Sequence, residues 1–239
     1  MSKYADLRQL LLENERCYVD EIHRLDHDPK VMQLPENAIE QGGGWLYLPS
    51  EPGSGDWNIA RMLGQGNVAV KALALLPDAE AHLLVPPKFA DLFAADHAAR
   101  SSLIYFEGCA APAHEQQPAL VDLSSLHAGL QLQSRRAGAD FAFYLLLAGQ
   151  IQGYIKAIHL TLHHVEVYVE VQPAMRQRGF GEYLLRAALR EAANTCRSLV
   201  YTVDAENVAS LALARKAGLQ QFMQLARFLR PYSGLSEPA

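Results

Sequence analysis

The sequence predicts a mixed α/β fold whose sheet begins with antiparallel strands and continues through helical crossovers. Two apolar runs flank the short turn Ala148-Gly149-Gln150, which is typical of a β-hairpin. The run VEVYVEV at residues 165–171 alternates strictly, as a strand with two different faces does. Residues 179–194 then place apolar side chains on one helical face. From residue 141 onward, the predicted order is strand, strand, strand, helix, strand, helix, strand.

The first half of the chain mixes helical and strand patterns. Apolar residues at helical spacing over residues 4–25 predict one or two helices. Pro29 ends that segment, because the residue before a proline leaves helical geometry. Residues 49–58, PSEPGSGDWN, have the composition of an exposed loop. We expect a helix at Lys88–Arg100 and strands at Trp45–Leu48, Ala81–Val85 and Leu103–Phe106.

The polar segment Gly108–Pro118 marks a domain boundary, which divides the chain into residues 1–115 and 116–239. The second part is expected to begin with a helix at Ser124–Arg136, which ends near Gly138. The elements expected after it are a hairpin of Phe141–Leu147 and Ile151–Leu160, a strand at Leu162–Val171, a helix at Gly179–Asn194, a strand at Leu199–Val203, a helix at Asn207–Ala217 and a strand at Leu219–Leu229.

Composition limits the classes of function. The formal charge of −5 and the pI near 6.0 provide no attraction to nucleic acid or to an anionic membrane. The N-terminus is charged throughout and no apolar run reaches the ~20 residues of a membrane span, so we expect a cytoplasmic protein. His163 and His164 point to opposite faces of one strand, and we expect no metal site. Three cysteines fit no metal or redox spacing and are expected to be reduced, namely Cys17, Cys109 and Cys196.

The segment VEVYVEVQPAMRQRGFG, residues 165–181, carries the clearest functional pattern. It predicts a strand that feeds a basic, glycine-containing loop at the N-terminus of a helix, where unpaired N–H groups and the helix dipole attract phosphate. The glycines let the backbone approach a ligand closely, and the arginines add positive charge. We therefore predict a pyrophosphate site formed by Arg176, Gln177, Arg178, Gly179, Phe180 and Gly181.

Two other phosphate-binding loops are disfavoured. A dinucleotide-binding fold needs G-x-G-x-x-G, and this chain has only G-F-G followed by Glu182. Asp204 lies near the distance expected for the acidic residue that binds the ribose, so the objection depends on the missing glycine and the two arginines. A P-loop is excluded more firmly, because no G-K-S/T follows the glycines.

Two motifs occur at matched spacing. Arg176-Gln177-Arg178-Gly179-Phe180-Gly181 follows Val171-Gln172-Pro173, and a second motif runs from Asn207-Val208-Ala209-Ser210 through Leu213, Lys216, Gly218 and Leu219. Together they resemble the pyrophosphate loop, R/Q-x-x-G-x-G/A, and the downstream motif, N-x-x-S/A-x-x-L-x-x-K-x-G-F/L, of the GNAT superfamily of acyl-CoA-dependent N-acyltransferases. The resemblance covers roughly residues 120–230 and implies a GNAT-like fold there. Some members carry a degenerate copy of the domain at the N-terminus, which the smaller mixed α/β region before it would allow.

The resemblance also implies a co-substrate, acetyl-CoA or another acyl-CoA, and no metal. Backbone groups near Val169 and Val171 would contact the pantetheine arm and the acyl carbonyl, while Asn207 and Ser210 would lie beside the cofactor. Each polar residue has another possible role. Asn207 also suits a helix N-cap, and the small size of Ser210 suits packing.

The alternating strand provides the candidate base. His164, Glu166, Tyr168 and Glu170 share one face, and the valines share the other. The family often uses a glutamate of this strand to deprotonate the amine, so Glu166 is the first candidate and Glu170 the second. The alternative is a half-exposed strand with solvated carboxylates, and a β-bulge would change which residues share a face.

The general acid departs from the family pattern. Many members have a tyrosine seven residues after the asparagine of the second motif, near the thiolate sulfur, and this chain has Ala214 there. Tyr168, Tyr201 and Ser210 are possible substitutes, and protonation by water or by the substrate amine is equally open.

The leading hypothesis is transfer of an acetyl or other short acyl group from acyl-CoA to a primary amine of a small molecule or peptide, by direct attack. The alternative, suggested by Ala214, is a non-catalytic CoA-binding regulatory module of the same fold. We expect a monomer or homodimer with no nucleic-acid or membrane partner. The acceptor amine does not follow from the sequence.

Overall fold

The computed structural model describes residues 5–28, 30–50, 57–109 and 123–231. These residues form one eleven-stranded mixed sheet, so the mixed α/β fold predicted from the sequence is confirmed. The strands lie in the order β1-β2-β3-β4-β11-β5-β10-β9-β8-β7-β6. Their bounds are β1 Met32–Leu34, β2 Gly43–Leu48, β3 Ile59–Gly64, β4 Ala81–Val85, β5 Ala98–Gly108, β6 Leu130–Ala137, β7 Asp140–Leu147, β8 Gln150–Leu160, β9 His164–Val171, β10 Ser198–Asp204 and β11 Gln220–Arg230.

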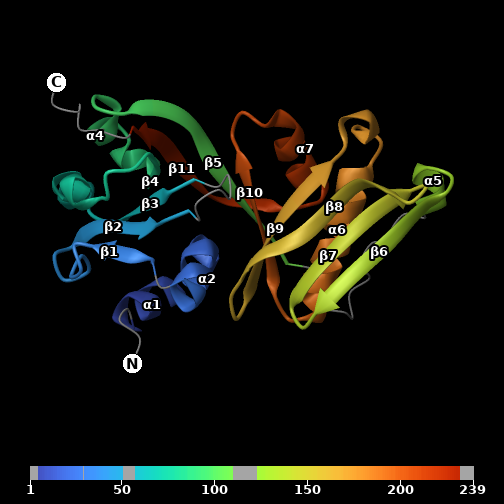
Figure 1. The fold of residues 1–239 in the computed structure, drawn as a ribbon, viewed down its shortest axis with the longest axis horizontal. Coiled ribbons are helices and arrows are strands. Elements are labelled where there is room, and N and C mark those ends of the chain that lie inside the picture. Colours follow the sequence, from blue (N-terminus) through green and yellow to red (C-terminus); the bar gives the residue numbers. More distant parts are fainter. Residues whose placement is uncertain (1–4, 29, 51–56, 110–122, 232–239) are drawn as a thin grey trace, which may run out of the picture.

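Helices lie on both faces of this sheet. In Figure 1 the elements of the first half of the chain lie at the left and β6 to β9 at the right, with β5, β10 and β11 between them. The α-helices are α1 Ala5–Leu12, α2 Val19–His27, α3 Gly66–Lys71, α4 Asp91–Ala94, α5 Leu123–Leu126, α6 Phe180–Asn194 and α7 Val208–Lys216.

The two halves of the sheet repeat one topology. In each half a helix joins two parallel neighbours, β3 to β4 through α3 and β9 to β10 through α6. A second helix, α4 or α7, then leads to a last antiparallel strand, β5 or β11. Each of these last strands lies beside the parallel pair of the other half rather than its own. β11 lies between β4 and β5, and β5 lies between β11 and β10. The repeat supports the interpretation of the first half as a degenerate copy of the second, which stays a prediction.

The exchanged strands join the two predicted domains within one sheet. β5 belongs to residues 1–115 by sequence, yet its residues Leu103–Gly108 pair with Leu199–Asp204 of β10. It also pairs with β11 along its other edge. The predicted boundary at 115/116 lies outside the described residues and stays a prediction.

Two predicted helices are wrong. At Ser124–Arg136 the structure has α5, which ends at Leu126, followed by the edge strand β6, and Gly129 (φ +79°) turns the chain directly before β6. The exposed side chains of β6 lack the alternation of a half-buried strand, so the sequence pattern there is ambiguous. The second half of the chain therefore begins with four strands, β6 to β9, rather than the three expected. At Lys88–Arg100 the α-helix ends at Ala94, and β5 begins at Ala98 because it pairs with the distant β11.

Alternate residues of the central strands pack on different helices. Val165 and Val167 of β9 join the apolar cluster that includes the inward face of α6. Glu166 points to the opposite face, which α2 covers at β8 and β9. Strand β2 is buried on both faces, since Leu46 and Leu48 pack with α1 and α2 while its other side chains pack in a separate cluster near α3. On the polar face of β9, Glu166 therefore lies under α2 from the first half of the chain, whereas Tyr168 and Glu170 are exposed.

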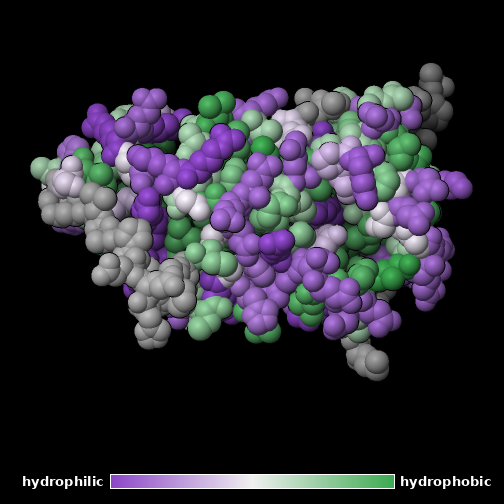
Figure 2. All heavy atoms as spheres, turned by 180° about the vertical axis from the view of Figure 1, so that it is seen from behind, coloured by the Kyte–Doolittle hydropathy of each residue, from purple (hydrophilic) through white to green (hydrophobic). Residues whose placement is uncertain are grey.

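The described residues include no helix that is both long and apolar enough to cross a membrane. Figure 2 shows the molecule from behind, with hydrophilic side chains over much of the surface and hydrophobic side chains in small, scattered groups. Apart from residues drawn in grey, this face shows no broad hydrophobic surface.

Candidate active site

The predicted phosphate loop joins β9 to α6 and presents unpaired backbone donors. Gln177 (φ +61°) and Gly179 (φ +85°) turn the chain into the helix, and Gly179 is its N-cap. The first N–H of α6 with a partner is that of Tyr183, which donates to the Gly179 carbonyl at 3.0 Å. Within the described part of the chain, no protein group accepts from the N–H groups of residues 178–182. The loop therefore retains the donors that a phosphate group needs.

Both glycines of the loop lie close to neighbouring side chains. A Cβ at Gly179 would lie 3.1 Å from Leu126 Cδ2, and one at Gly181 would lie 3.2 Å from Leu213 Cδ2. Gly179 also has a positive φ, which glycine adopts at little cost. Packing inside the protein therefore favours glycine here, in addition to any approach by a ligand.

The two arginines of the loop differ in their contacts. Arg176 Nε donates to the carbonyl oxygen of Val171 at 3.1 Å, across the end of β9. The side chain of Arg178 is exposed. The Val171 carbonyl, which was expected to face the pantetheine arm, thus accepts a hydrogen bond from Arg176 in this structure.

β9 and β10 separate beyond a short paired segment. Their parallel register runs from His164/Ser198 to Glu166/Val200 and stops there. From this point β9 remains paired with β8 as far as Val171, and β10 remains paired with β5. The edge of β9 that includes Val169 and Val171 therefore has no strand partner on the β10 side. Its backbone can bind an extended ligand there, as strand edges do.

Glu166 is buried where the two strands separate, with only 8% of its surface exposed. Thr202 Oγ1 donates to Glu166 Oε1 at 2.5 Å, and His159 Nδ1 lies 2.9 Å from Oε2. The other ring nitrogen of His159 lies 3.1 Å from Asp20 Oδ1 of α2. Burial alone would lower the pKa of His159, but the hydrogen bond to Glu166 and the charge of Asp20 raise it above its usual value. An imidazole between two carboxylates can hold and pass on a proton.

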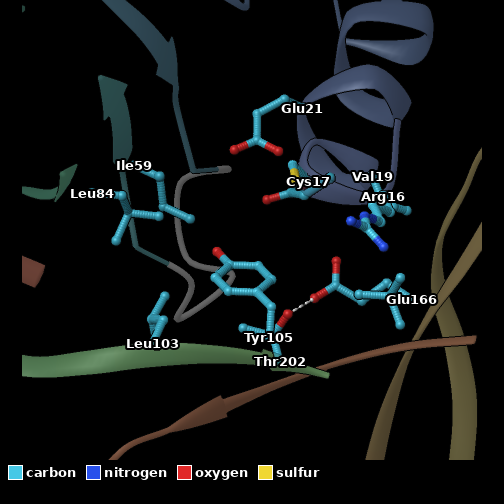
Figure 3. Close-up of a pocket in the computed structure, with 12 residues that line it drawn as sticks. Arg16, Cys17, Val19, Glu21, Ile59, Leu84, Leu103, Tyr105, Glu166 and Thr202 are labelled. Carbon is cyan, nitrogen blue, oxygen red and sulfur yellow. Dashed lines mark hydrogen bonds between the residues drawn. The ribbon is translucent and has the colours of Figure 1, made fainter. Parts of the chain in front are cut away.

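A pocket of about 140 Å³ lies beside Glu166, between the sheet and α2. Figure 3 shows Glu21 pointing into it from the helix, Tyr105 from β5, and Glu166 and Thr202 from β9 and β10. Both halves of the chain therefore line it. The pocket reaches the position where β9 and β10 separate, because Glu166 and Val200 both line it and are the last paired residues.

A buried ion pair borders the pocket. Arg61 of β3 and Glu21 are 3% and 4% exposed, and Arg61 Nη1 lies 3.7 Å from Glu21 Oε1. Burial raises the pKa of Glu21 to about 7, although the Arg61 charge opposes this shift. Burial likewise raises the pKa of Tyr105, whose hydroxyl lies 3.5 Å from Arg61 Nη1. Tyr105 therefore stays neutral.

Residues 108–219 match the family model described as the acetyltransferase (GNAT) family. This segment belongs to the GNAT family. It contains the open loop, the separating strands and Glu166.

Solved structures resemble a larger part of the chain. A GCN5-related N-acetyltransferase from Kribbella flavida is 13% identical over 84% of this chain and 96% of its own, with a TM-score of 0.57. A GCN5-related N-acetyltransferase-like protein from Streptococcus suis 89/1591 is 12% identical over 91% and 99%, with a TM-score of 0.56. A GNAT-family acetyltransferase from Colwellia psychrerythraea is 10% identical over 92% and 95%, with a TM-score of 0.53. These similarities show a shared fold. A search of curated proteins finds no match.

Within the GNAT segment, the structure separates the candidate catalytic residues. Glu170 and Tyr168 lie at the exposed end of β9, where Tyr154 Oη donates to Glu170 Oε2 at 2.9 Å and Tyr168 Oη donates to it at 3.4 Å. Burial and the hydrogen bond to Glu170 raise the pKa of Tyr154 to about 12. This exposed group makes no hydrogen bond to Glu166 among the described residues. The catalytic roles of all three candidates stay predictions.

The second GNAT motif has structural roles in this chain. Asn207 Oδ1 accepts from the Ser210 N–H at 3.0 Å, so Asn207 caps α7. Ala214, at the position where many family members have a tyrosine, is fully buried. Tyr201 is buried on the same side of the sheet, and burial raises its pKa despite a hydrogen bond with the Ser210 side chain. Cofactor contact by Asn207 and Ser210 stays a prediction.

Several residues at the site could not be identified from the sequence. Asp20 and Glu21 belong to an amphipathic helix of ordinary composition, and only their position in the fold brings them to β9. One weak signal exists in the sequence, since Arg61 interrupts the apolar run of β3 and is buried there. Among the described residues, no group of histidine, cysteine and acidic side chains could hold a metal ion.

Proposed function

We propose that this protein transfers an acetyl or other short acyl group from acyl-CoA to a primary amine. The observation that carries the proposal is the position of Glu166. It is buried beside a pocket at the point where β9 leaves β10, and β9 leads directly into the open loop before α6. Acyl-CoA would supply the activated acyl group.

The residues present fit acyl-CoA through three features. The free N–H groups of residues 178–182 and the guanidinium of Arg178 would bind the pyrophosphate. The edge of β9 near Val169 would orient the pantetheine arm. Glycine at positions 179 and 181 lets the loop pack closely against Leu126 and Leu213, which holds these donors in place.

Glu166 would then act as the general base. An amine attacks a thioester only when it is neutral, so its ammonium proton must leave first. Glu166 accepts hydrogen bonds from Thr202 and His159, which fix the carboxylate in place, and His159 connects it to Asp20. The proton would pass from the amine to Glu166 and be shared with His159. A cytoplasmic location, where CoA thioesters are available, is part of this proposal.

A thermal-shift experiment tests cofactor binding. A ligand that binds only the native state at 100 times its Kd stabilises it by ~2.7 kcal/mol, so acetyl-CoA is expected to raise the Tm. Gly181→Glu is expected to abolish this shift by placing a carboxylate beside the loop. Gly181→Ala is the control and should retain the shift, because Leu213 needs to move only slightly. Absence of any shift with the unaltered protein would refute the proposal.

The alternative is a CoA-binding module without catalytic activity, which Ala214 favours because it cannot protonate a thiolate. Release of free CoA thiol from acetyl-CoA in the presence of amines separates the two functions. Thiol release that depends on an amine supports the transferase. Stabilisation by acetyl-CoA without thiol release for any amine supports the module.

A further inference from the structure

The pocket beside Glu166 has mainly apolar walls. Strands of both halves contribute them, and the far wall comes from the first half of the chain, where Leu84 is only 3% exposed. A cavity of ~150 Å³ is large enough for a molecule the size of benzene, and this pocket measures about 140 Å³. The apolar side chains that line it are Val19, Ile59, Leu84, Leu103 and Val200.

The carboxylates around the pocket outnumber the guanidinium groups by one, so one more cation would balance the charge. Each carboxylate has a cationic partner, but there are four carboxylates and three guanidinium groups. The fourth carboxylate is balanced only when His159 carries a proton. The pairs are Glu21 with Arg61, Asp20 with Arg24, Glu107 with Arg16, and Glu166 with His159.

The acid–base properties of the pocket agree with this balance. The pKa of Glu21 is raised to about 7 by burial, and that of His159 is raised by Glu166 and Asp20. Both shifts favour an additional bound proton. An ammonium group that entered the pocket would supply the same positive charge and replace that proton.

We propose that this pocket binds the acceptor, and that the acceptor is a small aliphatic monoamine without a carboxylate. This inference depends on the proposed acyl transfer. The amine nitrogen lies at Glu166, where β9 and β10 separate, and the hydrocarbon extends past Leu103 toward Ile59 and Leu84. The volume limits the hydrocarbon to about six carbon atoms, the size of benzene.

The direction of the pocket disfavours lysine side chains of peptides. A lysine entering with its amine at Glu166 would have its backbone at the opposite end, beside Leu84, which is buried. An amino acid would bring its carboxylate into a pocket that already has an excess of carboxylates. A simple alkylamine satisfies both constraints.

The test measures how the preferred amine changes when the far wall moves. Thiol release from acetyl-CoA is followed with straight-chain amines from ethylamine to octylamine. Ile59 lies away from Glu166 and is only half-buried, so it can be altered without touching the proposed base. Ile59→Ala should move the optimum to an amine longer by one or two carbons, and Ile59→Phe should move it to a shorter one. Ile59→Val provides a milder enlargement if the alanine variant does not fold.

The control is Ile151→Ala, which shortens an isoleucine that is 48% exposed and does not line the pocket. Its length profile should match that of the unaltered protein. An ω-amino acid with the same number of carbons as the best amine should react at least ~10-fold more slowly, as expected from like-charge repulsion in a buried site.

Three results would overturn the inference without touching the proposed function. These are an unchanged length profile in the Ile59 variants, a preference for lysine peptides over alkylamines, and a preference for amino acids. If no amine releases thiol, titration calorimetry with hexylamine in the presence of CoA decides. Binding that weakens in Ile59→Phe but not in Ile151→Ala supports the acceptor pocket even if the proposed transfer fails, and absence of binding refutes it.

Discussion

Glu21 gives a pH dependence of stability whose sign and size follow from the structure. Burial raises its pKa from 4.5 to about 7. The folded state therefore binds more protons than the unfolded state between these values, and its stability falls as pH rises through this interval. The difference is about 2.5 pH units, and each unit corresponds to ~1.4 kcal/mol, so the loss attributed to Glu21 is about 3 to 4 kcal/mol.

The variant Glu21→Gln isolates this contribution because glutamine stays neutral at every pH. We expect the two proteins to have similar free energies of unfolding at pH 4.5, where Glu21 is largely protonated in the folded state. At pH 8 the variant should be more stable by about 3 to 4 kcal/mol. Carboxyl groups with lowered pKa values add the opposite slope to both proteins, and this slope cancels in the difference. They are Glu15, Asp26, Glu182 and Asp204.

Urea denaturation from pH 4.5 to 8 measures the difference. Glu13→Gln, on the exposed end of the same N-terminal region, is the control and should run parallel to the unaltered protein. If the Arg61 charge kept Glu21 ionised throughout, the Glu21→Gln variant would become the less stable protein at pH 8. That result, or a difference independent of pH, would refute the reasoning.

Three further outcomes are expected at the active site. Glu166→Gln should lower kcat/KM for the amine by ~10²–10⁴, the usual contribution of a general base, while the Tm shift with acetyl-CoA stays unchanged; an unaltered rate would exclude Glu166 as the base. The pKa of His159 is raised above its usual value of 6.5. Because His159 must lose its proton before it can share one from the amine, kcat/KM should increase as the pH rises through this raised pKa. In His159→Gln this rise should move to lower pH, and identical pH–rate profiles would contradict the proton-sharing role. Arg178→Ala should raise the Kd of CoA, measured by calorimetry, ~10-fold through loss of a charge-assisted contact. Arg215 is an exposed arginine of α7, and Arg215→Ala should leave the Kd unchanged. Equal effects of the two substitutions would show a non-specific charge effect.

The local part of the site could be predicted because neighbouring residues form it. A strand, a turn with Gly179 at positive φ and a helix N-terminus follow one another along the chain, so the backbone itself creates the donors of the phosphate loop. The alternation that places Glu166 opposite the valines is likewise a property of one strand. These features arise from the chemistry of consecutive residues.

Tertiary structure decided what Glu166 contacts. Its partner His159 lies on β8, opposite Glu166 on β9, and Asp20 comes from α2. Glu21 and Tyr105 reach the pocket from the first half of the chain. β6 and the start of β5 were predicted as helices because their short-range patterns were ambiguous. β6 pairs with its neighbour β7 in a hairpin, whereas β5 pairs with the distant β11. The sequence alone determined the loop and the polar strand, since hydrogen bonds and side-chain alternation there are local. Only the folded chain, by exchanging β5 and β11 between its halves, determined the pocket beside Glu166, because long-range strand pairing depends on the whole sheet.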